Sequence, residues 1–172
     1  MSEKEVLISI HPEFIQAIKD GYKTIEIRKR VPRLDPPYRC YMYCTKPKER
    51  VIEWVRDGDD LYGETYHGKA FPVTTPVFDY YGKWIGGKAG YVVGEFVCDY
   101  VGAFDLNAPS VAELAYRGCV TSKSIHEYAG ANNHLFGMII GEKTFYQESL
   151  PLQAFGLSRP PQSWCYVQQV GR

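Results

Sequence analysis

Short apolar runs separated by polar, glycine-rich and proline-rich breaks recur along the chain, and this pattern is typical of a protein built mainly from β-strands. Residues 6–10 form the first such run, so we expect a buried strand there. Pro12 suits the first turn of a helix, and apolar residues at helical spacing continue that helix until Gly21, a natural terminator. The opening therefore predicts a strand, a helix and, over residues 21–28, a turn followed by a second strand.

The remaining sequence adds strands and two short helices. Gly94 interrupts the longest strand candidate, which indicates a bulge or a close backbone approach. Ser110 is an expected helix N-cap, and Ser124 with Glu127 is an expected capping box. The elements together predict an α+β protein, a small mixed β-barrel with an N-terminal helix and short flanking helices. The additional strands are expected at 39–45, 91–101, 135–145 and 163–167, and the helices within 105–117 and 122–128.

The alternating pattern weakens between residues 46 and 88, where glycines and prolines recur. We interpret the chain, residues 1–172, as a single domain with a hairpin-rich insertion at about 46–88. The aromatic residues of this insertion could form a lid, a surface for a protein partner or a second small hydrophobic cluster.

Composition narrows the class of protein. With 172 residues, of which 45% are hydrophobic, the chain can bury a core and does not belong to the disordered class. Its apolar runs are far shorter than a membrane span, and its charged start lacks a signal-like region, so we expect a cytoplasmic protein without membrane association. The five cysteines are odd in number and lack C-x-x-C spacing, which argues against a disulfide framework or a zinc site. We expect neither a metal ion nor a cofactor.

The formal net charge is zero, yet basic residues cluster between positions 23 and 50. A local basic patch suits phosphate groups. The neutral total argues against a protein that coats long duplexes through counterion release alone. The charge pattern therefore favours local recognition of a phosphate or a nucleotide.

The segment 21–28 carries the strongest chemical signal. Strand alternation sends its polar side chains to one face and its two isoleucines to the other. An arginine there could contact a phosphate or a base edge, and a carboxylate could accept hydrogen bonds from an exocyclic amine. The lysine could bind phosphate or act as a base. The structural alternative is an ion pair on a solvated face, which contributes at most about 1 kcal/mol. The polar group comprises Lys23, Thr24, Glu26 and Arg28.

Other candidates flank this segment in the expected fold. Ser9 and His11 lie at the end of the first strand, and Arg30 follows the motif strand. Ser163 and Trp164 begin the last strand, where the tryptophan either stacks a base or packs into the core. We expect all five residues to contribute to a ligand-binding cleft together with the polar group of the motif strand.

Three stretches resemble a known family. The opening with G-x-K-T-x-E-x-R at 21–28 is similar to the start of an ASCH domain, which belongs to the PUA-like superfamily. Gly94-Glu95-Phe96 resembles the family's middle strand, and R-P-P-Q-S-W-C-Y-V at 159–167 resembles the C-terminal part of phage and bacterial members. The resemblance covers most of the chain except residues 46–88. It implies a PUA-like barrel with a cleft that binds RNA or reads a modified base.

One enzymatic branch of this superfamily also resembles the motif. Its members remove the acetyl group from N4-acetylcytidine and carry G-x-K-T-I-T-I-R. The resemblance makes Lys23 the counterpart of their catalytic lysine, whereas Glu26 stands where they have a catalytic threonine. Glu113 and Glu127 are candidates for their glutamate. Three hypotheses follow: an RNA-binding or modified-nucleoside-binding module, a hydrolase of modified nucleosides or a ribonuclease using Lys23 and Glu26, and a protein-interaction module that uses the insertion.

Overall fold

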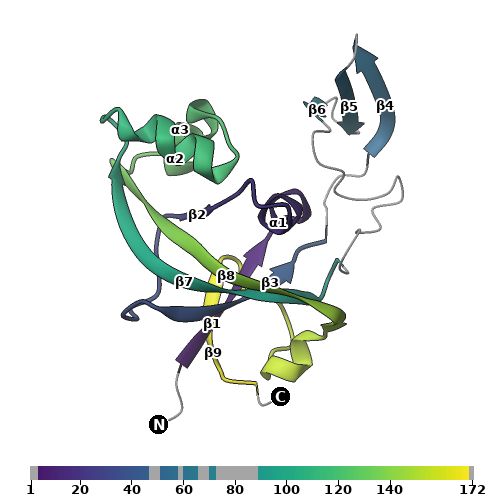
Figure 1. Cartoon of the computed structure of the whole chain (residues 1–172), viewed down its shortest axis with the longest axis vertical. Coiled ribbons are helices and arrows are strands. Elements are labelled where there is room, and N and C mark those ends of the chain that lie inside the picture. Colours follow the sequence, from purple (N-terminus) through teal and green to yellow (C-terminus); the bar gives the residue numbers. More distant parts are fainter. Residues whose placement is uncertain (1–3, 47–50, 58–59, 66–69, 73–88, 171–172) are drawn as a thin grey trace.

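A mixed six-stranded sheet forms the centre of the computed structural model, which describes residues 4–46, 51–57, 60–65, 70–72 and 89–170 (Figure 1). The strands follow the order β2-β8-β7-β3-β1-β9. β1 and β3 run parallel, and every other neighbouring pair is antiparallel. The strand bounds are β1 Lys4–Ile10, β2 Ile25–Arg28, β3 Tyr38–Cys44, β7 Val92–Asp105, β8 His134–Leu150 and β9 Trp164–Gln168.

The helix α1, Pro12–Lys19, lies in the crossover between the parallel strands β1 and β3. Pro12 is its first residue, where a missing N–H costs nothing. Gly21 follows the helix with a φ of 84°, a left-handed value that glycine adopts without strain. The predicted order of strand, helix and strand is confirmed, with β2 beginning at Ile25.

The sheet buries both of its faces along β1. Ile8 and Ile10 join a core cluster with α1, and Leu7 joins a second cluster on the opposite face with Tyr41 and Phe155. The short helix η1, Leu152–Phe155, contributes to that second cluster. Burial on both faces explains why the first run of the sequence is continuously apolar instead of alternating.

β7 and β8 are the longest strands, and they curve strongly where they carry the other helices (Figure 1). Three register shifts interrupt their pairing, one of them between Val92 and Gly94. A Cβ on Gly94 would lie 2.4 Å from the backbone oxygen of Thr144. The expected close backbone approach at Gly94 is therefore confirmed.

The helices α2, Ser110–Gly118, and α3, Ser122–Ala129, connect the far ends of β7 and β8. The expected caps are wrong in both helices. Pro109 is the N-cap of α2, and Ser110 is already helical. Thr121 caps α3 by accepting a hydrogen bond from the backbone N–H of Ser124 at 3.0 Å. A proline therefore starts α2 one residue before the polar side chain that the sequence suggested.

Residues of the expected insertion form a separate antiparallel sheet. Its strands are β4 Val51–Asp57, β5 Asp60–Thr65 and β6 Ala70–Pro72. The pairings of β4 with β5 and of β5 with β6 agree with the expectation of hairpins. Other expectations for the insertion fall on residues 47–50, 58–59, 66–69 and 73–88, which lie outside the described residues.

The α+β fold is confirmed, and the barrel takes the form of a curved sheet. Within the described ladders β2 and β9 are the two edge strands. Arg28, at the end of β2, hydrogen-bonds to Ser163 beside β9, so side chains join the two edges. None of the described helices is long and apolar enough to cross a membrane.

Candidate functional site

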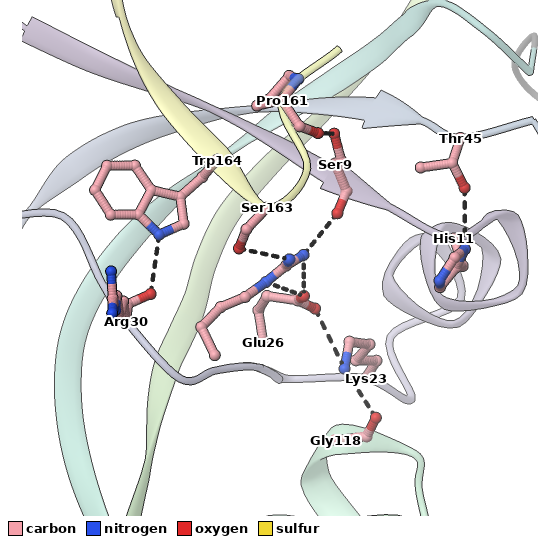
Figure 2. A network of polar contacts seen from close by, with 11 residues as sticks. Ser9, His11, Lys23, Glu26, Arg30, Thr45, Gly118, Pro161, Ser163 and Trp164 are labelled. Carbon is pink, nitrogen blue, oxygen red and sulfur yellow. Dashed lines mark hydrogen bonds and ion pairs between the residues drawn. The ribbon is translucent and has the colours of Figure 1, made fainter. Parts of the chain in front are cut away.

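Glu26 lies between two cations. Its Oε2 is 3.3 Å from Lys23 Nζ, and its Oε1 is 2.7 Å from Arg28 Nη2 (Figure 2). Arg28 Nε also donates to Oε1 at 3.0 Å. The side chains of Lys23, Glu26 and Arg28 are 3%, 7% and 11% exposed, respectively. The alternative of a solvated surface ion pair is therefore wrong, and the three groups form a buried triad.

The alternation of β2 explains part of this arrangement. Glu26 and Arg28 share one face of the strand, and Ile25 points into a hydrophobic cluster behind it. Thr24 does not join them, because β2 begins one residue later. Its hydroxyl instead accepts a hydrogen bond from Arg117 Nε at 3.2 Å.

Arg28 is held on all three of its nitrogens. Besides Glu26, it donates from Nη2 to the backbone oxygen of Ser9 at 2.6 Å and from Nη1 to Ser163 Oγ at 3.1 Å. Ser9 Oγ donates in turn to the backbone oxygen of Pro161 at 2.7 Å. A guanidinium has five N–H groups, so few donors remain for a ligand. Arg28 therefore positions Glu26 and joins the sheet edges.

Lys23 is anchored from the opposite side. Its Nζ donates to the backbone oxygen of Gly118 at 2.8 Å and lies 4.8 Å from the centre of the Phe14 ring. Gly118 is the last residue of α2, where the helix dipole favours a cation. The ammonium group thus links the motif strand to the helix pair.

The charges around Glu26 set its protonation. Burial raises the pKa of its carboxyl group, but the nearby charges of Lys23 and Arg28, with the hydrogen bond from Arg28, outweigh burial and hold the pKa below its usual value. Its Oε2 accepts no hydrogen bond from the described residues, although the Lys23 ion pair faces it. Glu26 is therefore a carboxylate at neutral pH, with one oxygen incompletely satisfied.

A cavity of about 850 Å³ adjoins the triad. Of the nine residues expected at the site, eight line it and Thr24 does not. Residues from α1, the loop after β3 and the α2–α3 region, together with Lys29, Gln162 and the isoleucines of β1 and β2, complete the wall. The lining residues are Ser9, Ile10, His11, Phe14, Lys23, Glu26, Ile27, Arg28, Lys29, Arg30, Thr45, Val120, Ser124, Ile125, Tyr128, Gln162, Ser163 and Trp164.

The wall is cationic and aromatic. Among the described residues, four lysine and arginine side chains line the cavity, against the single carboxylate of Glu26. Lys29 Nζ lies 4.9 Å from the centre of the Tyr128 ring, and Trp164 Nε1 donates to the backbone oxygen of Arg30 at 2.9 Å. His11 Nδ1 is 3.0 Å from Thr45 Oγ1 at the rim. Such a wall suits an anion that carries a flat ring.

In the part of the chain that the structure describes, the cavity has neither a second glutamate for amide hydrolysis nor a set of metal ligands. Glu113 and Glu127, the candidates for an amidohydrolase glutamate, are 63% and 67% exposed and pair with Arg117 and Lys123 on the helix surface. Neither lines the cavity. No described cluster of three histidine, cysteine, aspartate or glutamate side chains could hold a metal ion.

Solved structures share this arrangement of elements. ASCH from Zymomonas mobilis aligns with a TM-score of 0.61 at 17% sequence identity, over 94% of this chain and 86% of that one. The chain has the ASCH fold. A serine-to-alanine variant of the same protein gives a TM-score of 0.62, also at 17% identity, over 96% of this chain and 89% of that one. The resemblance that the motifs suggested is thus confirmed as a shared fold.

Sequence comparison gives a shorter match. No family model matches the chain. A curated protein of Zymomonas mobilis, named ASCH domain-containing ribonuclease, is 45% identical over 49 residues, which are 28% of this chain and 33% of that protein. The match therefore spans about a third of the relative's length. It agrees with the ASCH fold of this chain.

Proposed function

We propose that this ASCH-fold chain binds RNA, or a modified nucleoside within it, in the cavity beside the buried triad. The observation that carries the proposal is the cationic and aromatic wall built around the Lys23–Glu26–Arg28 triad. A volume of about 850 Å³ falls in the range of roughly 300–1,000 Å³ that is typical of small-ligand sites. The ASCH fold and the name of the curated relative support an RNA ligand.

In this proposal, some residues of the cavity contact the phosphate groups of the ligand and others contact its base. Lys29 and Arg30 are exposed at the cavity and meet the phosphate groups. Tyr128 and Trp164 provide rings against which a base can stack. Glu26 Oε2 is the acceptor that an amino group of the base reaches after a small shift of Lys23.

Fluorescence anisotropy with a labelled single-stranded RNA of about 12 nucleotides tests this proposal. Lys29→Ala and Arg30→Ala should each weaken binding roughly fivefold and reduce its salt dependence. Lys123→Ala is the matched control, because Lys123 is 85% exposed on α3 and does not line the cavity. Binding that is equal in all three variants and the unmodified protein would refute the cavity as the RNA site.

A ribonuclease activity in the same cavity is the second candidate, because the curated relative carries that name. Lys23 and Glu26 would be its catalytic residues: the carboxylate is ionised and able to accept a proton, and the ammonium group can stabilise developing negative charge.

Gel analysis of the same RNA after incubation separates binding from cleavage. An enzyme should yield product fragments that Lys23→Met abolishes, and thermal unfolding of that variant controls for loss of fold. Intact RNA alongside measurable binding supports the binding module. N4-acetylcytidine, incubated in parallel, tests the hydrolase of modified nucleosides by release of acetate.

A further inference from the structure

A continuous path of aromatic and basic residues leads out of the cavity along β9. Trp164 lines the cavity, and its ring centre lies 5.3 Å from that of Tyr166. Tyr166 is 39% exposed, and Lys4 Nζ lies 5.5 Å from the centre of its ring. The backbone N–H of Arg33 donates to the Tyr166 hydroxyl at 2.8 Å. We call Trp164, Tyr166, Arg33 and Lys4 the β9 strip.

Strand geometry explains the order of the strip. Trp164 and Tyr166 are two residues apart in β9, so their side chains share one face. Trp164 pairs with Ile8 of β1, and Tyr166 pairs with Val6. Lys4 lies further along the same face of β1. The strip therefore runs from the cavity towards the start of β1, over roughly 13 Å at about 3.3 Å per residue.

The charge of the strip matches a phosphate backbone. Lys4 and Arg33 are exposed, and no described contact pairs either side chain with a carboxylate. Asp35 is the acidic residue of the loop that contains Arg33, and it is also exposed. Cations interleaved with exposed rings are the pattern by which proteins hold single-stranded nucleic acid.

We propose that the ligand of the cavity is one nucleotide of a longer single-stranded RNA, whose neighbouring nucleotides lie along the β9 strip. This inference rests on the proposed RNA-binding function and deepens it, because it selects a polymer over a free nucleoside. Neighbouring bases stack on Trp164 and Tyr166, and their phosphates meet Arg33 and Lys4.

Packing alone gives a weaker explanation of the strip. Trp164 packs against the main core cluster, so its position follows from folding. Tyr166 is different, because it keeps 39% of its surface exposed while its hydroxyl accepts a hydrogen bond from the loop. Lys4 Nζ lies over the ring, and a partly exposed ring that is held in place is preorganised for stacking.

The experiment measures affinity against RNA length. Labelled single-stranded RNAs of two, four, eight and about 12 nucleotides are titrated with the full chain by fluorescence anisotropy. Affinity should rise at least roughly tenfold from the shortest to the longest RNA, since each stacked base adds binding energy. Lys4→Ala should weaken binding of the longest RNA a few fold and lower the slope of log K against log salt by about 0.7.

Matched variants separate the strip from general surface effects. Tyr166→Ala should weaken binding of the longest RNA roughly tenfold, whereas Tyr166→Phe should retain the affinity because the ring remains. Tyr116→Ala is the control for an exposed tyrosine outside the strip, and Lys123→Ala is the control for an exposed lysine. Binding of the dinucleotide should be the same in all of these proteins.

The outcomes distinguish this inference from the function on which it rests. Equal affinity for all lengths, or unchanged binding of the longest RNA by Lys4→Ala and Tyr166→Ala, overturns the strip. If Lys29→Ala still weakens binding in that case, the cavity function stands alone. If strip variants weaken binding and cavity variants do not, the RNA does not enter the cavity. The proposed function and the present inference then both fail as stated. RNA that binds at no length also overturns both.

Discussion

Arg28 and Ser163 join the two edges of the curved sheet. Arg28 ends the edge strand β2, and Ser163 precedes the edge strand β9. Their side chains meet at 3.1 Å, and the same guanidinium also binds the backbone oxygen of Ser9 in the neighbouring strand β1. The side chain of Arg28 therefore links β2 to β9, two edge strands that are not paired by backbone hydrogen bonds.

We expect Arg28→Met to lower the free energy of unfolding by about 3–5 kcal/mol, because it removes these hydrogen bonds and leaves the Glu26 carboxylate buried with one cation fewer. Urea unfolding followed by circular dichroism measures the change. Lys123→Met is the control, since it breaks only an exposed pair and should cost less than about 1 kcal/mol. A loss of similar size in both variants would show that Arg28 does not join the edges.

Glu26 should make the free energy of unfolding depend on pH in the acidic range. Its pKa is lowered in the folded protein, so its stabilising contribution is complete above the ordinary value of 4.5 and disappears as the pH falls through the lowered pKa. Glu26→Gln removes this contribution, and at neutral pH it should destabilise the protein by about 3 kcal/mol.

Urea unfolding of both proteins between about pH 7 and about pH 3 tests this sign. The difference between the two proteins should be constant above pH 4.5 and shrink below it, while effects of the other carboxylates cancel. A difference that grows on acidification would contradict a lowered pKa for Glu26.

Gly94 and Gly102 make a matched pair within β7. Gly94→Ala should destabilise the protein by about 3 kcal/mol, because the new methyl group would meet the backbone oxygen of Thr144 at 2.4 Å. The nearest atoms to a Cβ on Gly102 lie at 3.4 Å, an ordinary contact. Gly102→Ala should therefore change stability by less than about 1 kcal/mol. Thermal unfolding of the two variants checks the contrast.

The start of α3 offers a second matched pair. Thr121→Ala should cost about 1 kcal/mol, because it removes the acceptor for the backbone N–H of Ser124. Ser110→Ala should have little effect, since Ser110 is helical and makes no capping bond in α2. Chemical denaturation of both variants measures this, and an equal loss would show that the two helix starts are held alike.

The sequence predicts the local geometry of β2 and its neighbourhood in the candidate site. Alternation along β2 places Glu26 and Arg28 on one face, and the motif identifies Lys23. Thr24 departs from this expectation because β2 begins at Ile25, so strand alternation does not extend to Thr24. The exact start of a strand depends on its partner, and β8, the partner of β2, lies more than a hundred residues later.

The distant part of the site leaves no local signal. Ser124 and Tyr128 reach the cavity because the helix pair sits at the far ends of β7 and β8, and nothing in the sequence of α3 marks a ligand-binding role. Trp164 poses a different difficulty, because stacking and core packing were alternatives in the sequence. It does pack against the core cluster while it also lines the cavity.

The position of Ser163 has a consequence for synthesis of the protein. A ribosome releases β2 early, but Ser163, which Arg28 binds to join the two edges of the sheet, emerges more than a hundred residues later. Until then Arg28 has no serine hydroxyl to bind, and one wall of the cavity does not exist. Under the proposed function, a nascent chain cannot bind RNA in the cavity until translation has passed Ser163.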